Sequence, residues 1–201
     1  MDAVVCRSLN GLDGIEVTSV DPPALGAGQV RVKVFAAGVN FADLLIISGK
    51  YQVKPDLPFI PGLEVSGEII EVGQQVSRLR VGQRVAALTG VGGYAQEVVC
   101  SQDTVIPIPD VMPFAEAAGF LVAYGTSHIG LVHRAGLREG ETLLVHGASG
   151  GVGLTAVEIG ALCGARVIGT VGSEEKKAVV LEKGAEAVIN YRTEDFRTRT
   201  L

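Results

Sequence analysis

Residues 142–153, which read TLLVHGASGGVG, constrain the fold of this chain more than any other segment. The apolar run Leu143–Val145 is typical of a strand buried on both faces of a parallel sheet, and residues 154–162 continue with apolar side chains at helical spacing. Four glycines lie at or near the junction: Gly147, Gly150, Gly151 and Gly153. The segment therefore predicts a strand, a tight turn and a helix N-terminus, whose N–H groups and partial positive charge suit a dinucleotide pyrophosphate.

The turn matches the dinucleotide-binding pattern with one replacement. Ala148 stands at the first position of G-x-G-x-x-G, Gly150 would let the backbone approach the phosphates, and Gly153 would let helix and strand pack closely. An ATP P-loop is disfavoured because Leu154 stands where a Lys is needed. A glycine-rich helix entry that serves packing alone is the alternative. The cofactor-binding residues expected here are Ala148, Ser149, Gly150, Gly151, Val152 and Gly153.

The residues after this turn extend the same pattern. Residues 166–171 and 187–190 are predicted to be strands, with a charged helix over 173–183 between them. This is the βαβαβ order of one half of a doubly wound parallel sheet. The sequence thus predicts an α/β domain of the Rossmann type, of which this chain holds the first half.

The end of the second strand indicates which dinucleotide is bound. An NAD site usually has an Asp or Glu there, about 20 residues past the turn, but this strand runs into Gly172 and Ser173. Glu174–Glu175 instead begin the next helix, where acidic side chains suit the helix dipole. Ser173, Lys176 and the helix N-terminus make a seat for a 2′-phosphate, so NADPH is preferred over NADH. The alternative is that Lys176 and Lys177 form a solvated helix face.

The N-terminal part of the chain has a different sequence pattern. Alternating segments such as Val30–Phe35, separated by Pro and Gly turns, predict a small β-rich domain. Pro113 is expected in the first turn of a helix that leads into the α/β part. We therefore predict one domain over residues 1–122 and a second over 123–201. The strands expected in the first are residues 3–6, 30–35, 68–72, 84–88 and 94–99.

Composition excludes several classes. A net charge of −5 without a cationic run argues against a nucleic-acid groove. No apolar stretch approaches membrane-spanning length, and the N-terminus enters a strand-like segment directly, so we expect a cytoplasmic protein that does not bind a membrane. The odd number of distant cysteines, Cys6, Cys100 and Cys163, suggests neither a disulfide framework nor a metal clip.

Taken together, these motifs resemble the medium-chain dehydrogenase/reductase superfamily, and within it the zinc-free quinone oxidoreductase branch. The resemblance covers the whole chain, and the order and spacing of its parts are more specific than any one of them. It implies an incomplete GroES-like β-barrel catalytic domain followed by the first half of a Rossmann NADPH-binding domain. Its parts are Gly38–Asp43, Ser48–Tyr51, Pro61–Gly67, Val81–Val85, the glycine turn, Gly169–Ser173 and Val188–Arg192.

The resemblance also implies that no metal is bound. Zinc enzymes of this superfamily place Cys, His and Cys at positions that match Asn40, Leu63 and Val122, and neither Leu nor Val can ligate a metal. The histidines do not form a ligand cluster by spacing, and each is expected on a helix face or in a turn; they are His128, His133 and His146.

Without a Lewis acid, the implied chemistry is hydride transfer from the nicotinamide to a quinone or an α,β-unsaturated carbonyl. In the segment that resembles the family's substrate pocket, Asn40 is assigned as an amide donor and Tyr51 as a donor or proton relay. Asp43 is expected to hold local structure, and an ordinary turn role is the alternative for Asn40 and Asp43. By the same resemblance, Thr126 would touch the nicotinamide side, and Lys176 and Tyr191 the 2′-phosphate and adenine.

Members of this family continue with a second Rossmann half and then return to complete the catalytic domain. We therefore expect the strand at 143–145 to keep one unpaired apolar edge. A catalytically silent chain, which binds nucleotide weakly or engages a partner protein through that edge, is the alternative function. The full-length form is expected to be a homodimer.

Overall fold

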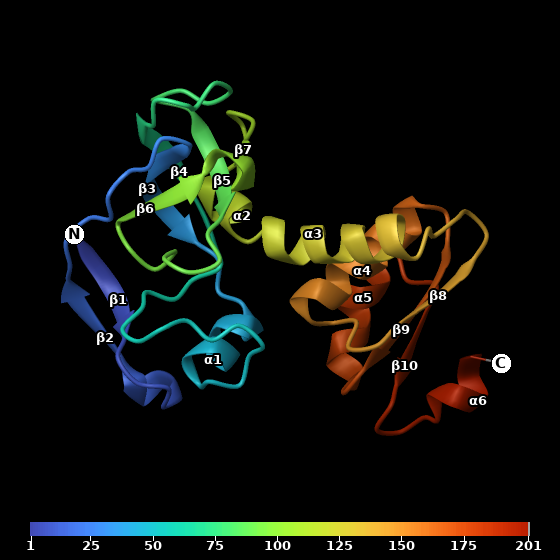
Figure 1. Cartoon of the computed structure of the whole chain (residues 1–201). Coiled ribbons are helices and arrows are strands. Elements are labelled where there is room, and N and C mark those ends of the chain that lie inside the picture. The colour runs from blue at the N-terminus through green and yellow to red at the C-terminus, as the bar shows by residue number, and fades with distance from the viewer. Residues whose placement is uncertain (201) are drawn as a thin grey trace. The chain divides into compact units, whose positions relative to one another are not determined.

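The structure is a computed structural model, and it describes residues 1–200. The chain forms two compact units, Met1–Val122 and a second that begins at Ala123 (Figure 1). The first is rich in antiparallel strands and the second is α/β, as the sequence predicted.

The first unit is built on a five-stranded antiparallel sheet in the order β6-β3-β4-β5-β7. Its strands are β3 (Gln29–Ala37), β4 (Glu64–Val72), β5 (Arg84–Leu88), β6 (Glu97–Ser101) and β7 (Val105–Pro107). A separate hairpin pairs β1 (Asp2–Cys6) with β2 (Ile15–Ser19). The helical segments are η1 (Gly11–Gly14), α1 (Phe41–Ile47), η2 (Gln102–Thr104) and α2 (Phe114–Ala118), and α3 (Leu121–His128) leads into the second unit.

Strand periodicity explains the core of this sheet. Val30 and Val32 on β3 are fully buried at alternate positions and pack with Val65, Ile69 and Val85 of neighbouring strands. Register shifts interrupt the β3–β4 pairing at two places, where β-bulges bend a strand and increase its twist. The sheet therefore curls around one apolar core.

Several expected boundaries were wrong; the strand predicted over residues 68–72, for example, begins at Glu64. The strand predicted from Tyr94 begins at Glu97, because the backbone before it turns to β1, where Val4 N–H donates to the Tyr94 carbonyl at 2.8 Å. Pro113 precedes the first helical residue, Phe114, with an extended ψ of 143°. Proline suits both the cap and the first turn, because its missing N–H has no helical partner at either place.

The second unit contains the predicted βαβαβ order. Its parallel strands are β8 (Thr142–Val145), β9 (Arg166–Val171) and β10 (Ala187–Asn190), in the order β10-β9-β8. Within residues 1–200, β8 therefore has one edge without a paired strand, as expected. The helical segments are η3 (Ile129–Arg134), α4 (Gly151–Leu162), η4 (Glu174–Lys176), α5 (Lys177–Glu182) and α6 (Phe196–Thr200).

The helix predicted over residues 173–183 is divided. A 3₁₀ turn, η4, comes first, and the α-helix proper starts only at Lys177 and ends at Glu182. Gly184 stops it with a φ of +104°, a value that favours glycine. Among residues 1–200, none of the helices combines the length and the hydropathy that a bilayer crossing requires.

Thiol labelling will report the packing of both units. Burial raises the pKa of Cys100 to about 12 and also raises that of Cys6, whereas Cys163 is only half-buried. Because the thiolate is the reactive form, iodoacetamide at pH 8 should modify Cys163 first and spare the other two until denaturant is added. Peptide mass spectrometry measures this order, and labelling of Cys100 as fast as Cys163 in the native protein would contradict it.

Candidate active site

The glycine turn lies between β8 and α4 and is bonded to β9. Gly147 has a φ of +64°, and its carbonyl accepts the N–H of Gly150 at 3.0 Å. Gly150 is the N-cap of α4, and Ala148 N–H donates to the carbonyl of Thr170 at 2.9 Å. The turn is thus fixed to the carboxyl ends of two adjacent strands, where open α/β sheets bind their ligands.

Steric contacts show why these residues are small. A Cβ on Gly153 would lie 2.3 Å from the carbonyl oxygen of Gly147 and 2.8 Å from the Cα of Ala148, so helix and turn meet only without a side chain. Ala148 is fully buried, and a Cβ on Gly169 would lie 2.9 Å from its methyl group. The chain thus accommodates alanine at the first turn position because glycine stands opposite it on β9.

The remaining turn residues face solvent to differing degrees. Gly150, Gly151 and Val152 are exposed and Ser149 is half-buried. A Cβ on Gly151 would meet nothing within 4 Å, so its lack of a side chain is not needed for packing. The sequence missed Gly160, where a Cβ would lie 2.6 Å from a methyl group of Leu143, so that this glycine lets α4 approach the strand.

Two of the predicted cofactor residues, Gly172 and Tyr191, lie against each other where β9 and β10 end. A Cβ on Gly172 would lie 2.5 Å from the hydroxyl of Tyr191, so the phenol lies across Gly172. Ser173 has extended backbone and hydrogen-bonds Glu175, which lowers the pKa of that carboxyl. Lys176 follows in η4 and is exposed. Gly172 and Tyr191 therefore meet at one corner of the sheet, where β9 and β10 end, and Ser173 and Lys176 follow Gly172 in the chain.

Ion pairs distinguish the two neighbouring lysines. Lys177 binds Glu174 at 3.1 Å and Glu194 at 3.0 Å, and Asn190 donates to Glu174 at 2.7 Å. Among residues 1–200, Lys176 has no ion pair within 4.0 Å. The alternative that both lysines form a solvated helix face is therefore wrong for Lys177. Its ion pairs join α5 to η4 and to Glu194, which follows β10.

A hollow of about 500 Å³ adjoins this corner, at the carboxyl ends of the three strands. Its wall includes His146, whose Nδ1 lies 3.2 Å from Thr170 Oγ1 and whose ring meets Phe196 edge-on. Sequence reasoning named neither Thr170 nor Phe196, although the ends of consecutive parallel strands are the signal that finds such residues. Thr126, expected on the nicotinamide side, is exposed on α3.

The first unit holds a polar cluster formed by the buried Asp43 and Glu64 and the half-buried Asn40 and Tyr94. Asn40 Nδ2 donates to Glu64 Oε1 at 3.0 Å, and the Asn40 N–H donates to Asp43 Oδ2 at 2.8 Å. Asp43 also accepts the hydroxyl of Tyr94 at 2.9 Å, and Glu64 accepts the N–H of Val122 at 2.9 Å. Asp43 thus caps α1 and holds Tyr94, and Glu64 fixes the Asn40 amide.

Burial sets the chemistry of this cluster. Asp43 and Glu64 are 3% and 1% exposed, and Asp43 Oδ1 is buried with no hydrogen-bond partner among residues 1–200. Burial raises the pKa of Tyr94, and the carboxylate of Asp43 raises it further, so the phenol stays a proton donor. Sequence reasoning missed Glu64 and Tyr94. A Cβ on Gly38 would lie 2.6 Å from Glu64 Oε1, so this glycine makes room for the carboxylate.

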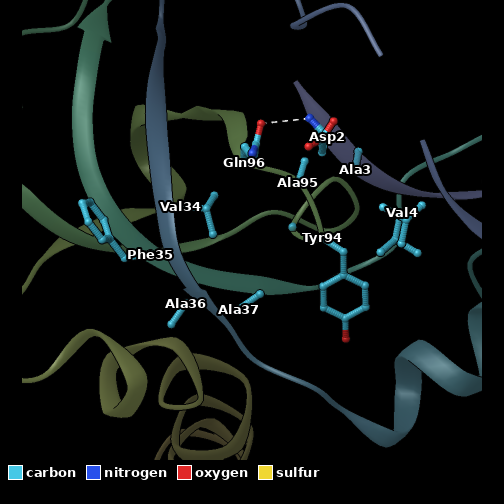
Figure 2. A pocket seen from close by; sticks show the side chains of 12 residues that line it. Asp2, Ala3, Val4, Val34, Phe35, Ala36, Ala37, Tyr94, Ala95 and Gln96 are labelled. Atoms are coloured by element: carbon cyan, nitrogen blue, oxygen red, sulfur yellow. Dashed lines mark hydrogen bonds between the residues drawn. The ribbon is translucent and has the colours of Figure 1, made fainter. Parts of the chain in front are cut away.

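Tyr51 is not part of the polar cluster. It is half-buried and packs against an apolar cluster that includes Ile46, Ile47 and Phe59. Tyr94 is the phenol that the fold places at Asp43. Tyr94 also lines a hollow of about 440 Å³ together with residues of β3, and its hydroxyl points away from Asp2 and Gln96 (Figure 2).

The three positions that match zinc ligands have other partners. Asn40 and the backbone of Val122 both donate to Glu64, and Leu63 packs with apolar side chains. Within residues 1–200, no group of three or more His, Cys, Asp or Glu side chains is arranged to hold a metal ion.

Replacing Glu64 tests how firmly it fixes the cluster. The Glu64 carboxylate accepts hydrogen bonds from two N–H groups. In Glu64→Gln, one of these two donors would face the N–H₂ group of the glutamine instead of an acceptor oxygen. Leaving a buried donor unpaired should lower the free energy of unfolding by about 1–3 kcal/mol, as urea denaturation measures. Glu68→Gln, on the same strand, is the control and should change stability by less than about 0.5 kcal/mol. Equal losses in both variants would contradict the role of Glu64.

Comparison with known proteins agrees with both units. Residues 26–110 match the alcohol dehydrogenase GroES-like domain, and residues 151–200 match the zinc-binding dehydrogenase family. The predicted GroES-like domain and Rossmann-type half are therefore confirmed.

Individual relatives are longer than this chain. It is 44% identical over 199 residues to a quinone oxidoreductase-like protein 2 homolog of Nematostella vectensis, covering 98% of the chain and 54% of the relative. Identity to a quinone oxidoreductase of Lama guanicoe is 46%, covering 96% and 59%.

A solved structure shows the same arrangement of elements. The Escherichia coli quinone oxidoreductase crystallised with NADPH superimposes with a TM-score of 0.93 at 31% identity, covering 99% of this chain and 61% of that one. The chain thus spans little more than half the length of these relatives. The order of its motifs, its fold and these matches show that the chain belongs to the medium-chain dehydrogenase/reductase superfamily, among the quinone oxidoreductases and quinone oxidoreductase-like proteins.

Proposed function

We propose that this chain is the cofactor-binding and substrate-orienting part of an NADPH-dependent reductase that transfers hydride to quinones or α,β-unsaturated carbonyls without zinc. The observation that supports the proposal is the corner where β9 and β10 end: Tyr191 lies against Gly172, Ser173 and Lys176 follow in the chain, and the glycine turn is bonded to β9. A 2′-phosphate is the group that this hydroxyl, ammonium and phenol together would bind. The NADPH complexes of several related structures support this choice.

Residues of the second unit would bind the dinucleotide. The N-terminus of α4, with the exposed Gly150 and Gly151, would bind the pyrophosphate through backbone N–H groups. In the free protein, Glu175 hydrogen-bonds Ser173, so this carboxylate must turn away when a phosphate arrives. Thr126 would contact the nicotinamide side. When bound, the cofactor supplies the hydride.

Residues of the first unit would orient the acceptor. Asn40 Nδ2 carries two hydrogens, one of which Glu64 accepts, and we assign the other to the oxygen of the acceptor. This donor would stabilise the negative charge that develops on the oxygen as hydride arrives. Asp43 keeps the structural role of capping α1, and Tyr51 is assigned as the second donor or proton relay.

Zinc independence rests on the same contacts. An ion at the positions of Asn40, Leu63 and Val122 would need ligands that two apolar side chains do not provide. The amide of Asn40 therefore takes the polarising role that a Lewis acid has elsewhere. We further propose a cytoplasmic protein, without nucleic-acid or membrane partners, whose full-length form is a homodimer. Residues 1–122 would be its catalytic part and residues 123–201 its NADPH-binding part.

Enzyme assays with the purified chain test this function. NADPH oxidation, followed at 340 nm with a panel of quinones and enones, should persist in EDTA and should fall in Asn40→Ala by about 100-fold or more in kcat, the loss that follows removal of one such donor. Asn10→Ala, which removes an exposed amide bonded only to Ser8, is the matched control and should retain activity.

The alternative is a silent chain that engages a partner protein through the unpaired edge of β8. If calorimetry showed normal NADPH binding but no acceptor were turned over, the catalytic proposal would be overturned. The silent chain would then be the remaining explanation. Loss of activity in EDTA would overturn zinc independence alone.

A further inference from the structure

His128 and His133 lie side by side in the second unit, although the sequence separates them by five positions. An α-helix turns about 100° per residue, so side chains five apart point about 140° away from each other. Here α3 ends at His128 and continues as the π-helix η3, in which Ala135 N–H donates to the carbonyl of Gly130, five residues earlier. The wider turn brings the imidazole centroids to 5.2 Å, with ring planes 68° apart. Both histidines lie on helical segments, as expected, and the π-helical turn makes them neighbours, which their spacing did not predict.

We propose that His128 and His133 form a binding site for one divalent transition-metal ion of the copper, nickel and zinc class. Imidazole nitrogens are ligands that these ions prefer. Two imidazoles that share a tetrahedral ion through bonds of about 2.0–2.1 Å have ring centroids about 5 Å apart, which is the separation found here. Both side chains are exposed, so the ion would reach them from solvent.

The surroundings define the kind of site. Among residues 1–200, no third His, Cys, Asp or Glu side chain completes a ligand group, so water fills the remaining coordination positions. Structural zinc sites have four protein ligands. A pair that leaves coordination positions to water therefore binds an exchangeable ion, which occupies the site when the metal is abundant and leaves it in a chelator. Single π-helical turns occur frequently at functional sites, although their hydrogen-bond pattern is rare.

This site is independent of the proposed reductase chemistry. His146, the third histidine, lies at the end of β8 beside Thr170, and the polar cluster around Asn40 belongs to the first unit. Edge-to-face packing of aromatic rings has a similar centroid separation without any metal. Metal titration separates the two explanations, because packed rings bind no ion.

The test is a calorimetric titration of tag-free protein with Cu²⁺, followed by Ni²⁺ and Zn²⁺. One ion per chain is expected, and His128→Ala and His133→Ala should each weaken binding by at least tenfold, roughly the lower limit for disturbing a metal site. His146→Ala and Cys163→Ser are the controls, because they remove the remaining imidazole and the half-buried thiol. Both should bind as the unaltered protein does.

Electron paramagnetic resonance of the Cu²⁺ complex adds a readout that needs no variant. Two nitrogen ligands in the unaltered protein, and one in each single variant, support the site. A single nitrogen ligand, or unchanged affinity in the variant that lacks both histidines, identifies adventitious surface binding and overturns the proposal. Circular dichroism of each variant verifies that the fold is retained.

Discussion

Gly153→Ala is expected to destabilise the second unit and to abolish measurable nucleotide binding. The added Cβ would lie 2.3 Å from the Gly147 carbonyl oxygen, and both atoms belong to the backbone or are rigidly attached to it. Helix α4 must then move away from the turn, and the N–H groups at its N-terminus move with it. Overpacking of this kind costs about 1–3 kcal/mol, and Gly153→Val should cost more. Urea denaturation measures the stability, and calorimetry with NADPH measures the binding.

Gly151→Ala is the matched control, because it adds the same methyl group two residues earlier. A Cβ there meets nothing within 4 Å, and Gly151 is the first residue of α4. Alanine favours helix by up to about 1 kcal/mol relative to glycine, so stability should stay equal or rise. If both substitutions destabilised the protein equally, the close approach of helix and turn would not be the reason for Gly153.

Lys176→Ala is expected to weaken NADPH binding by about 10- to 100-fold and to leave NADH binding almost unchanged. The loss corresponds to about 1.5–3 kcal/mol for a hydrogen bond to a charged group. Lys176 is exposed, so the effect should shrink as salt is raised, because exposed charges are screened. Calorimetric titrations with both dinucleotides, at low and at physiological ionic strength, measure the ratio.

Lys177→Ala separates this role from general loss of positive charge. Lys177 is held by Glu174 and Glu194, so its removal should affect both dinucleotides similarly, through disturbance of η4 and α5. Equal weakening of NADPH and NADH by Lys176→Ala would make Lys176 a surface residue, and the preference for NADPH would have to come from Ser173 and Tyr191.

Local patterns predicted most of the second unit. Strands β9 and β10 have the predicted bounds, and the predicted strand 143–145 lies within β8, because buried parallel strands are short, continuous apolar runs. The turn was predictable because glycine permits backbone conformations and close approaches that other residues do not. The split between η4 and α5 was not, because the ion pairs of Lys177 involve Glu194 on a distant segment.

The polar cluster shows the limit of the sequence more clearly. Asn40 and Asp43 were identified by their place in a motif, but their partners Glu64 and Tyr94 lie 24 and 51 positions away. Periodicity reports which face of a strand is buried, and it does not report which side chain of another element meets that face. Tyr51 was selected by its place in the segment that resembles the family's substrate pocket, and the contact of Tyr94 with Asp43 could not be found in this way.

The sequence by itself determined the two-part architecture and the glycine turn, because these depend on interactions among residues close in the chain. Tertiary structure alone decided that Glu64 holds the amide of Asn40, that Tyr94 meets Asp43, and that Lys177 is paired while Lys176 is exposed. It also decided that a π-helical turn brings His128 to His133. Each of these contacts depends on where a distant backbone segment, or a change of helix type, places a side chain. The spacing of residue types along the sequence does not encode that placement.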